Sequence, residues 1–540
     1  MGKIKCWVLA AILVLGLVLR LWALDKFPSG FSADEASYGY NAYSLLKTGR
    51  DEWGEPWYQL IYTNLRSFGD ARFPLYSFLA IPSIKLLGLN EFAVRLPNAI
   101  LGTLAIAAVY LLAKKLINWQ TGQLAALLLA ISPWHVSLSR GAFETNTLTL
   151  LAPLGIYLLL SSRFWLAAVI LSLNTYSYIA ARALTLPVAI ITMWITKASR
   201  QNWLKFIVIF LVIAGPGLGF MIKSGNTRVA DVGIFNPTDN WHEVATRRFE
   251  ARNLGLPDIA ARIFSNKVLY LASNFTQNYL SYFSPQFLFT SGAGEATYGM
   301  IPGRGALYYI EIPFLLLFFI SFIKSPSQNK LLLILLLLIS PLPAALSKGG
   351  GFAANRVASM IPILTIMVSV GIINFLEIFK KYQKSLTIIM VVIYGVSLTF
   401  FLEDYFYHGP KVSAQSMSYG WRELMPRLAS IAREYDQVFV SRSLSEPHIF
   451  VAFYSQMDPK IYQSYSQNWK DFDKNGLKFL DQYDGYYLGK YRFGNLNLDK
   501  AKLQKTLLVG RPQDIPHEFG QYFSIYYPNG DPAIQVSKSL

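Results

Sequence analysis

The stretch Gly30-Phe-Ser-Ala-Asp34-Glu35-Ala-Ser-Tyr38 follows the first apolar segment of the chain. Ser32 and Glu35 have the spacing of a capping box, in which each side chain satisfies a free backbone N–H group of the other's region. The stretch therefore predicts the start of a helix, which an apolar stripe continues and Gly49 ends. It places two carboxylates just beyond a predicted membrane boundary. The rest of the chain is then searched for groups on the same side of the membrane.

The composition is that of a polytopic membrane protein. Of the 540 residues, 53% are hydrophobic and only 15% are charged, whereas soluble domains carry about 25% charged residues. The net charge of +17 then indicates cytoplasmic loops and anionic lipid headgroups rather than nucleic acid. Cys6 is the only cysteine, which excludes an intramolecular disulfide, and the five histidines show no spacing typical of metal ligands.

Eleven apolar runs have about the length that a membrane span requires. The first lacks the small-residue cleavage site of a signal peptide and is interpreted as an uncleaved helix. The predicted spans are 7–24, 95–113, 119–139, 145–161, 164–181, 183–196, 203–222, 305–323, 331–347, 356–376 and 385–403.

Charge placement predicts the topology of these spans. With the N-terminus in the cytoplasm, every predicted inside loop carries Lys or Arg, as the positive-inside rule requires. The outward segments are then the loops 25–94 and 223–304, the first with interfacial helices, and a C-terminal tail. We therefore predict an all-α membrane domain over residues 1–404 and an extracytoplasmic domain over 405–540, in a multi-pass protein of the plasma membrane.

The tail has the pattern of a small α/β domain. Trp421–Tyr435 and Leu498–Lys505 have helical apolar spacing, whereas Gln437–Val440 and Lys460–Tyr465 are typical of short strands. The tail contains no glycine pattern of the nucleotide-binding type.

Three carboxylates are candidates for chemistry. Asp34 and Glu35 could simply favour the helix dipole, but ionisable groups beside a membrane are often functional. Glu35 suits the cap better, which leaves Asp34 freer to act as a base. Glu144 lies four residues after Arg140, so on a helix these two could pair with each other, or both could line an outward cavity.

Arginines gather at the outer ends of the predicted spans, where the positive-inside rule expects few of them. For Arg20 and Arg95, contact with lipid headgroups is an equal alternative. The others suggest an anionic ligand, because the guanidinium group binds phosphate through two hydrogen bonds. The predicted phosphate-binding residues are Arg72, Arg140, Arg182, Arg304 and Arg356.

A lipid-linked phosphate explains both the position and the charge of these groups. Arginine side chains would stabilise the negative charge of a departing phosphate, while a carboxylate on the opposite face of the sugar takes the proton of an acceptor hydroxyl. One base without an enzyme nucleophile predicts inversion at the anomeric carbon. The alternative is a transporter or flippase for lipids or solutes, although no repeated halves or mid-membrane charges support it.

The sequence also resembles glycosyltransferase family 39 and its relatives, which include protein O-mannosyltransferases and the lipid A aminoarabinose transferase. The resemblance covers most of residues 1–400. Its motifs are Arg20-Leu-Trp-Ala-Leu-Asp-Lys-Phe-Pro28, Asp34-Glu-Ala-Ser-Tyr-Gly-Tyr-Asn41, Thr48-Gly-Arg-Asp-Glu52, Arg72-Phe-Pro-Leu-Tyr76, Arg95-Leu-Pro97, Arg140 with Glu144, Tyr282-Phe-Ser-Pro-Gln-Phe-Leu-Phe289 and Arg356 before Ile361-Pro362.

The resemblance implies a C-type membrane fold, a polyprenyl-phosphate sugar donor and transfer to a glycan, lipid or protein on the outer face. It gives Asp34 the place of the catalytic acid of the first loop and Glu35 that of its neighbour. Glu144 stands where the family usually has Asp, and Arg72-Phe-Pro74 replaces a usual Pro-Pro pair. No metal cofactor is expected, but the oligosaccharyltransferase relatives leave Mg²⁺ or Mn²⁺ on Asp34 and Glu144 as an alternative.

Overall fold

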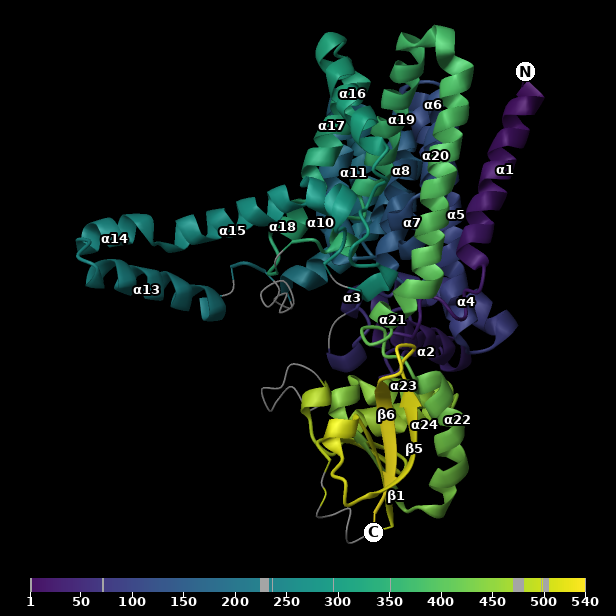
Figure 1. Ribbon diagram of the computed structural model, residues 1–540, viewed down its shortest axis with the longest axis vertical. Helices are drawn as coiled ribbons and strands as arrows, with labels where there is room; N and C mark the ends of the chain where they lie inside the picture. Colours follow the sequence, from purple (N-terminus) through teal and green to yellow (C-terminus); the bar gives the residue numbers. More distant parts are fainter. Residues whose placement is uncertain are drawn as a thin grey trace.

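The computed structural model describes residues 2–69, 72–223, 233–235, 237–294, 296–349, 351–469, 480–496, 498 and 505–539. Figure 1 shows a long helical bundle, a layer of short helices at one end of it, and a domain with a β-sheet beyond that layer. The N-terminal end of α1 (Gly2–Leu21) and the domain that contains the C-terminus lie at opposite ends of the molecule.

A helix lies in each of the eleven apolar ranges predicted from the sequence. Five described helices are long and apolar enough to cross a membrane, namely Glu91–Leu116, Arg200–Phe220, Gln328–Ala345, Met360–Ile378 and Lys380–Ser413. Because length and composition select five helices and not eleven among the described residues, the number of crossings stays a prediction. With α1, the helices of the bundle are α5 (Glu91–Leu116), α6 (Trp119–Ile131), α8 (Thr147–Leu160), α9 (Phe164–Asn174), α10 (Ile179–Ile195), α11 (Arg200–Lys223), α16 (Glu311–Lys324), α17 (Gln328–Ile339), α19 (Met360–Ile378) and α20 (Gln383–Glu403).

Polar caps and apolar packing define these helices. The Asn90 side chain accepts a hydrogen bond from Ala93 N at the start of α5, and Asn118 accepts one from Thr121 N at the start of α6. Such caps satisfy N–H groups that have no partner in the first helical turn. Residues of α5, α6, α17 and α19 then form one continuous buried core, so α5 and α19 lie inside the bundle.

The layer at the end of the bundle is the first long loop, with α2 (Ala33–Thr48), α3 (Leu60–Thr63), η1 (Ser67–Gly69) and α4 (Leu75–Leu87). The predicted capping box is confirmed, because Glu35 N donates to Ser32 Oγ at 3.3 Å and Ser32 N donates to Glu35 Oε2 at 3.0 Å. Gly49 ends the helix with φ at 69°, as predicted. The cap therefore fixes which way Asp34 and Glu35 point.

The C-terminal domain contains a six-stranded sheet in the order β2-β3-β1-β4-β6-β5. Strand β1 is parallel to β3 and β4, and the other pairs are antiparallel. The elements of the domain are α22 (Trp421–Ile431), β1 (Gln437–Ser441), α23 (Pro447–Tyr454), α24 (Pro459–Ser466), β2 (Tyr487–Leu488), β3 (Tyr491–Gly494), β4 (Thr506–Gly510), β5 (Gly520–Tyr526) and β6 (Pro532–Lys538).

The sequence predicted the first two of these elements correctly, the helix at Trp421 and the strand at Gln437. The predicted strand at Lys460–Tyr465 is wrong, because these residues belong to helix α24. Asp458 caps that helix by accepting from Lys460 N at 2.8 Å, and Pro459 pre-sets its first turn. The predicted helix at Leu498–Lys505 lies outside the described residues except at its two ends.

The first loop and the C-terminal domain share one apolar core. Tyr40 Oη donates to Met457 O at 3.0 Å, Gln463 Nε2 donates to Asp51 O at 2.9 Å, and Trp53 contacts Trp469 edge to face. The division of the chain at residues 404 and 405 stays a prediction, but the C-terminal domain packs directly on the layer that carries Asp34.

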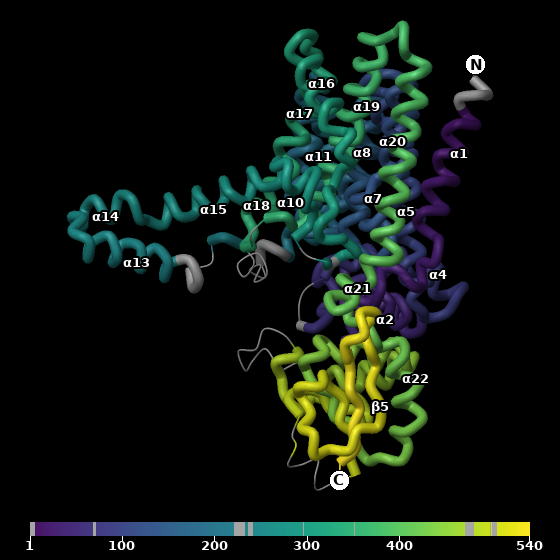
Figure 2. The backbone as a smooth tube through the Cα atoms, in the orientation of Figure 1, coloured from purple at the N-terminus to yellow at the C-terminus, as the bar shows by residue number. Residues whose placement is uncertain are grey.

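A helical arm leaves the bundle sideways. It consists of α13 (Pro237–Asn253), α14 (Asp258–Phe264) and α15 (Lys267–Ser281), all within the predicted loop 223–304. Figures 1 and 2 both show the arm extending away from the bundle, near the end that faces the C-terminal domain. The chain then returns through η3 (Gln286–Thr290) and η4 (Thr297–Gly299) to the bundle.

Candidate active site

A cavity of about 410 Å³ lies where the first loop meets α10 and the short elements α18 (Leu342–Ala345) and η5 (Ala354–Val357). Most of its apolar lining residues belong to α10 and α18, which form its apolar wall, and the other lining residues include hydroxyl, carboxyl, amide and guanidinium groups. The lining residues are Tyr38, Arg72, Phe73, Glu144, Tyr178, Ile179, Ala180, Ala183, Gly233, Tyr298, Pro343, Ala344, Leu346, Ser347, Ala353, Asn355 and Arg356.

Asp34 lies at the edge of this cavity through its ion pair with Arg72. The guanidinium Nη2 of Arg72 is 2.6 Å from Asp34 Oδ1, and the Asp34 side chain is 29% exposed. Arg72 is held in place by two backbone hydrogen bonds with Leu65 and by the ring of Phe68, 4.8 Å from its guanidinium carbon. The pair joins the first turn of α2 to the cavity wall and leaves Asp34 accessible.

Glu35, the neighbour of Asp34, points into the protein instead. It forms an ion pair with Arg95 at 2.8 Å in which neither side chain is exposed, and its Oε1 accepts a hydrogen bond from Ala142 N at 2.9 Å. The Arg95 guanidinium also donates to the carbonyl oxygens of Leu24, Pro28 and Gly30. The structure therefore places Glu35 outside the cavity lining.

Glu144 does line the cavity. It begins the short helix η2 (Glu144–Asn146) and is 7% exposed. Burial raises the pKa of the Tyr298 hydroxyl, and the negative charges of Asp34 and Glu144 raise it further. The same two carboxylates raise the pKa of Tyr38 after burial, while Arg72 lowers it. Asp34 and Glu144 thus act electrostatically on the same two tyrosines.

The Arg140 side chain makes its contacts outside the cavity. Its guanidinium donates to Leu19 O at 2.7 Å and Trp22 O at 2.5 Å, at the C-terminal end of α1, and packs against the rings of Tyr405 and Phe406. The interpretation that Arg140 and Glu144 are four residues apart on one helix is wrong, because α7 (Pro133–Leu138) ends before them. The structure does not bring Arg140 into the cavity lining.

Of the remaining predicted arginines, one lines the cavity and two do not. Arg356 lines the cavity and donates to Ser347 Oγ at 2.6 Å and Lys348 O at 3.1 Å. Arg182 lies behind the cavity residue Phe73, whose ring centroid is 4.3 Å from its guanidinium carbon. Arg304 forms an ion pair with Asp404 and is not among the lining residues.

Arg20 and Arg95 do not reach lipid headgroups, which excludes the snorkelling interpretation for both. Each is fully buried. Arg20 contacts His135 Nδ1 at 2.8 Å and donates to the carbonyl oxygens of Gly16 and Ala130, so it joins α1 to the rest of the bundle. Both arginines therefore connect buried parts of the fold.

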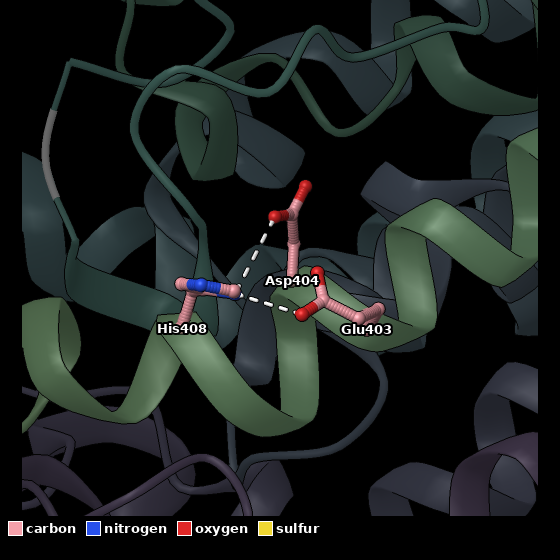
Figure 3. Close-up of side chains that lie close together, drawn as sticks. All are labelled: Glu403, Asp404 and His408. Atoms are coloured by element: carbon pink, nitrogen blue, oxygen red, sulfur yellow. Dashed lines mark ion pairs between the residues drawn. The ribbon is translucent and has the colours of Figure 1, made fainter.

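A second cluster of ionisable groups lies at the end of α20. Figure 3 shows His408 pointing toward Glu403 and Asp404, with Nδ1 3.1 Å from Glu403 Oε1 and 4.0 Å from Asp404 Oδ1. Among the described residues, this is the group whose spacing suits a metal ion, and the sequence analysis missed it. Because Arg304 already pairs with Asp404, the cluster is explained as an ion-pair network.

The sequence analysis also missed most of the aromatic lining. Tyr38 lies within the stretch Gly30–Tyr38, but Tyr178 and Tyr298 come from distant segments. Tyr298 has a left-handed backbone with φ at 56°, a strained conformation that is concentrated at functional sites. No local pattern distinguishes these tyrosines from the other 29.

The fold is that of known membrane glycosyltransferases of the C type. ArnT from Cupriavidus metallidurans bound to undecaprenyl phosphate aligns with a TM-score of 0.53 and 12% identity, over 99% of this chain and 98% of ArnT. Its apo structure aligns with a TM-score of 0.52 and 12% identity, over 100% and 98% of the two chains. The apo oligosaccharyltransferase of Archaeoglobus fulgidus aligns with a TM-score of 0.50 and 13% identity, over 98% and 74%.

A sequence comparison supports the same class over a shorter part of the chain. Residues 71–220 match the model of the dolichyl-phosphate-mannose-protein mannosyltransferase family. A comparison with curated proteins found no match. The resemblance inferred from the motifs is confirmed, and the chain is a multi-pass integral membrane protein with the C-type glycosyltransferase fold.

Proposed function

We propose that this protein transfers a sugar from a polyprenyl-phosphate-linked donor to an acceptor hydroxyl, with inversion, on the extracytoplasmic side of the membrane. The observation that carries the proposal is the ion pair of Asp34 with Arg72, beside a cavity that Glu144 and Arg356 also line. The C-type fold and the undecaprenyl phosphate bound by the similar ArnT support the choice of donor.

The two cavity arginines would bind the donor phosphate. Arg72 and Arg356 come from segments almost 300 residues apart and meet in one cavity beside an apolar wall. A guanidinium group that is already positioned stabilises the negative charge on a departing phosphate without further reorganisation. We assign Arg182 a supporting role, because it holds Phe73 in the lining.

Asp34 would act as the general base. It takes the proton of the acceptor hydroxyl while the new bond forms between that oxygen and the anomeric carbon and the bond from this carbon to the phosphate oxygen breaks. A carboxylate on one side and a phosphate on the other give inversion. Glu144, with the hydroxyl groups of Tyr38 and Tyr298 nearby, would orient the sugar by hydrogen bonds.

Glu35 and Arg140 would then support the site rather than react. Both Glu35 oxygens bind Arg95, Ser32 or Ala142, and this fixes the turn that presents Asp34. We also propose that transfer needs no metal ion, because guanidinium groups supply the positive charge beside Asp34 and at the phosphate. Chelation by EDTA should then leave the rate unchanged.

The test is a transfer assay with purified protein in nanodiscs, labelled polyprenyl-phosphate sugars and cell-envelope material as acceptor. Asp34→Asn should lower the rate by about 10²- to 10⁴-fold, the usual contribution of a general base, while donor binding persists. The matched control is Asp25→Asn, because Asp25 pairs with Arg422 outside the cavity. Donor translocation across liposomes without any sugar transfer would instead support the transporter.

A further inference from the structure

The helical arm carries an exposed apolar surface that no part of the described chain covers. Most of its exposed large apolar side chains lie on α14, on α15 and in the turn before α14, whereas α13 contributes a single one. The exposed residues are Phe249, Leu254, Ile259, Ile263, Phe264, Val268, Leu269 and Leu280. Exposed apolar surface of this extent marks contact with a partner or a membrane.

The arm is held together and tethered at its base. Arg248 donates to Ser265 O at 2.9 Å, and the Lys267 ammonium lies 3.6 Å from the centre of the Trp241 ring, so α13 is fastened to α14 and α15. At the base, Tyr279 Oη donates to Leu338 O at 2.8 Å. Its sideways projection is therefore set by specific contacts.

The two sides of the arm differ in polarity. In Figure 1, α15 runs on the side of the bundle and α13 on the side of the C-terminal domain. α13 is rich in charged and polar residues, whereas α14 and α15 carry most of the exposed apolar ones. The helices α14 and α15, which carry most of the exposed apolar side chains, thus lie on the side of the arm nearer the bundle.

The charge of the arm also suits a lipid surface. Between residues 237 and 281 the arm has five basic residues, Arg247, Arg248, Arg252, Arg262 and Lys267, and four acidic ones. Asp258 is paired with both Arg252 and Arg262. Basic side chains beside exposed apolar ones are the pattern of helices that lie in a membrane interface.

We propose that the arm lies along the membrane surface nearest the C-terminal domain and inserts the apolar side chains of α14 and α15 among anionic lipids. Ordinary globular helices do not expose so many large apolar side chains, and a lipid interface covers them while the basic groups contact phosphate headgroups. The occupant of this surface is the bilayer rather than another protein.

The base of the arm reaches the cavity. Asn278 of α15 donates to Ser347 O at 3.1 Å, and Ser347 Oγ accepts the hydrogen bond from Arg356. Just before α13, Ile234 N donates to Leu346 O at 3.0 Å, and Gly233 itself lines the cavity. The arm therefore joins the membrane surface to one wall of the cavity.

The experiment measures how deeply single positions lie in lipid. Cys6 is the only native cysteine, so Cys6→Ser gives a background in which Ile263→Cys and Thr246→Cys are each labelled with an environment-sensitive nitrobenzoxadiazole dye. Thr246 is the matched control, exposed on the polar helix α13. The protein is placed in nanodiscs of phosphatidylcholine and phosphatidylglycerol, with one copy per disc to exclude contact between copies.

The dye at Ile263 should emit at a shorter wavelength, be quenched by lipids with a spin label high on the acyl chain, and be shielded from aqueous iodide. The dye at Thr246 should show the opposite pattern. Equal iodide quenching at the two positions, in protein with the thermal unfolding midpoint of the Cys6→Ser background, would overturn the proposal. If the spin-labelled lipids quench the dye at Ile263 only when phosphatidylglycerol is present, the proposal stands. Anionic headgroups then attract the arm to the membrane.

Discussion

Glu35 and Arg95 form an ion pair of 2.8 Å in which neither side chain is exposed to solvent. The pair links the first turn of α2 to α5, and Arg95 also binds three carbonyl oxygens of the segment that leads into α2. Of two adjacent carboxylates, Glu35 therefore holds the turn, whereas Asp34 pairs with Arg72 of the cavity lining. This division of roles leads to the first prediction.

Glu35→Gln should destabilise the protein by about 3–5 kcal/mol, because it leaves the buried Arg95 without its counter-charge. Thermal unfolding in detergent measures the effect. Glu423→Gln is the control, since it breaks an exposed pair with Arg427 and should cost less than about 1 kcal/mol. If Glu35→Gln unfolds like the control and yet abolishes transfer, Glu35 takes part in the chemistry.

Arg140→Gln should lower stability by about 2–3 kcal/mol and leave the KM for the donor within about twofold. Its hydrogen bonds go to carbonyl oxygens at the end of α1, and bonds from charged groups contribute about 1.5–3 kcal/mol. Unfolding and steady-state kinetics on the same preparation separate the two effects. A large rise in KM with unchanged stability would show that Arg140 binds the donor.

Arg356→Gln should raise the KM for the polyprenyl-phosphate donor by about 10- to 100-fold, the loss expected for one charged hydrogen bond. Arg304→Gln is the matched control, because Arg304 pairs with Asp404 away from the lining residues. Its KM should stay within about twofold of the wild-type value. If Arg304→Gln raises the KM and Arg356→Gln does not, the phosphate binds at the end of α20 instead.

Glu52 should make the stability of the protein pH-dependent. It is buried between the first loop and the C-terminal domain, and burial raises its pKa to about 8, with Asp51 nearby raised to about 7. Above a pH of about 4.3 the unfolded chain ionises Glu52 while the folded protein keeps it neutral. Stability should therefore fall by up to about 1.4 kcal/mol per pH unit until the folded pKa is passed.

Glu52→Gln should flatten this dependence, so that the variant gains stability over the wild type as the pH rises from 5 to 8. Thermal unfolding midpoints across that range measure it, with Glu423→Gln as the control that keeps the wild-type slope. A slope that Glu52→Gln leaves unchanged would assign the pH dependence to other groups.

Local patterns predicted much of the fold. The helix at Ala33–Thr48 follows from the capping box and Gly49, and the apolar runs predicted where the bundle helices lie. The strand predicted at Lys460–Tyr465 is wrong, because Asp458 caps a helix there and Pro459 occupies its first turn. The helical arm within the loop 223–304 was not predicted, because its helices are too polar to resemble membrane spans.

The site was harder to predict, because its residues depend on partners far away in the chain. The sequence placed Asp34, Arg72, Glu144 and Arg356 at one end of the spans. The structure brings the last three into one cavity lining, and Asp34 pairs with Arg72 beside it. The same reasoning included Arg140 and Arg304, whose partners at α1 and Asp404 no local pattern shows. Tyr298 reaches the cavity from an irregular segment, so spacing alone does not reveal it.

The proposed function requires a polyprenyl phosphate to bind beside Asp34. A cryo-electron microscopy structure of the protein in nanodiscs with undecaprenyl phosphate tests this most directly. The account predicts that the phosphate lies within hydrogen-bond distance of Arg72 and Arg356, with the lipid chain along the apolar wall at α10 and α18. A phosphate bound instead at Arg304 or Arg140, with the cavity beside Asp34 empty, would contradict it.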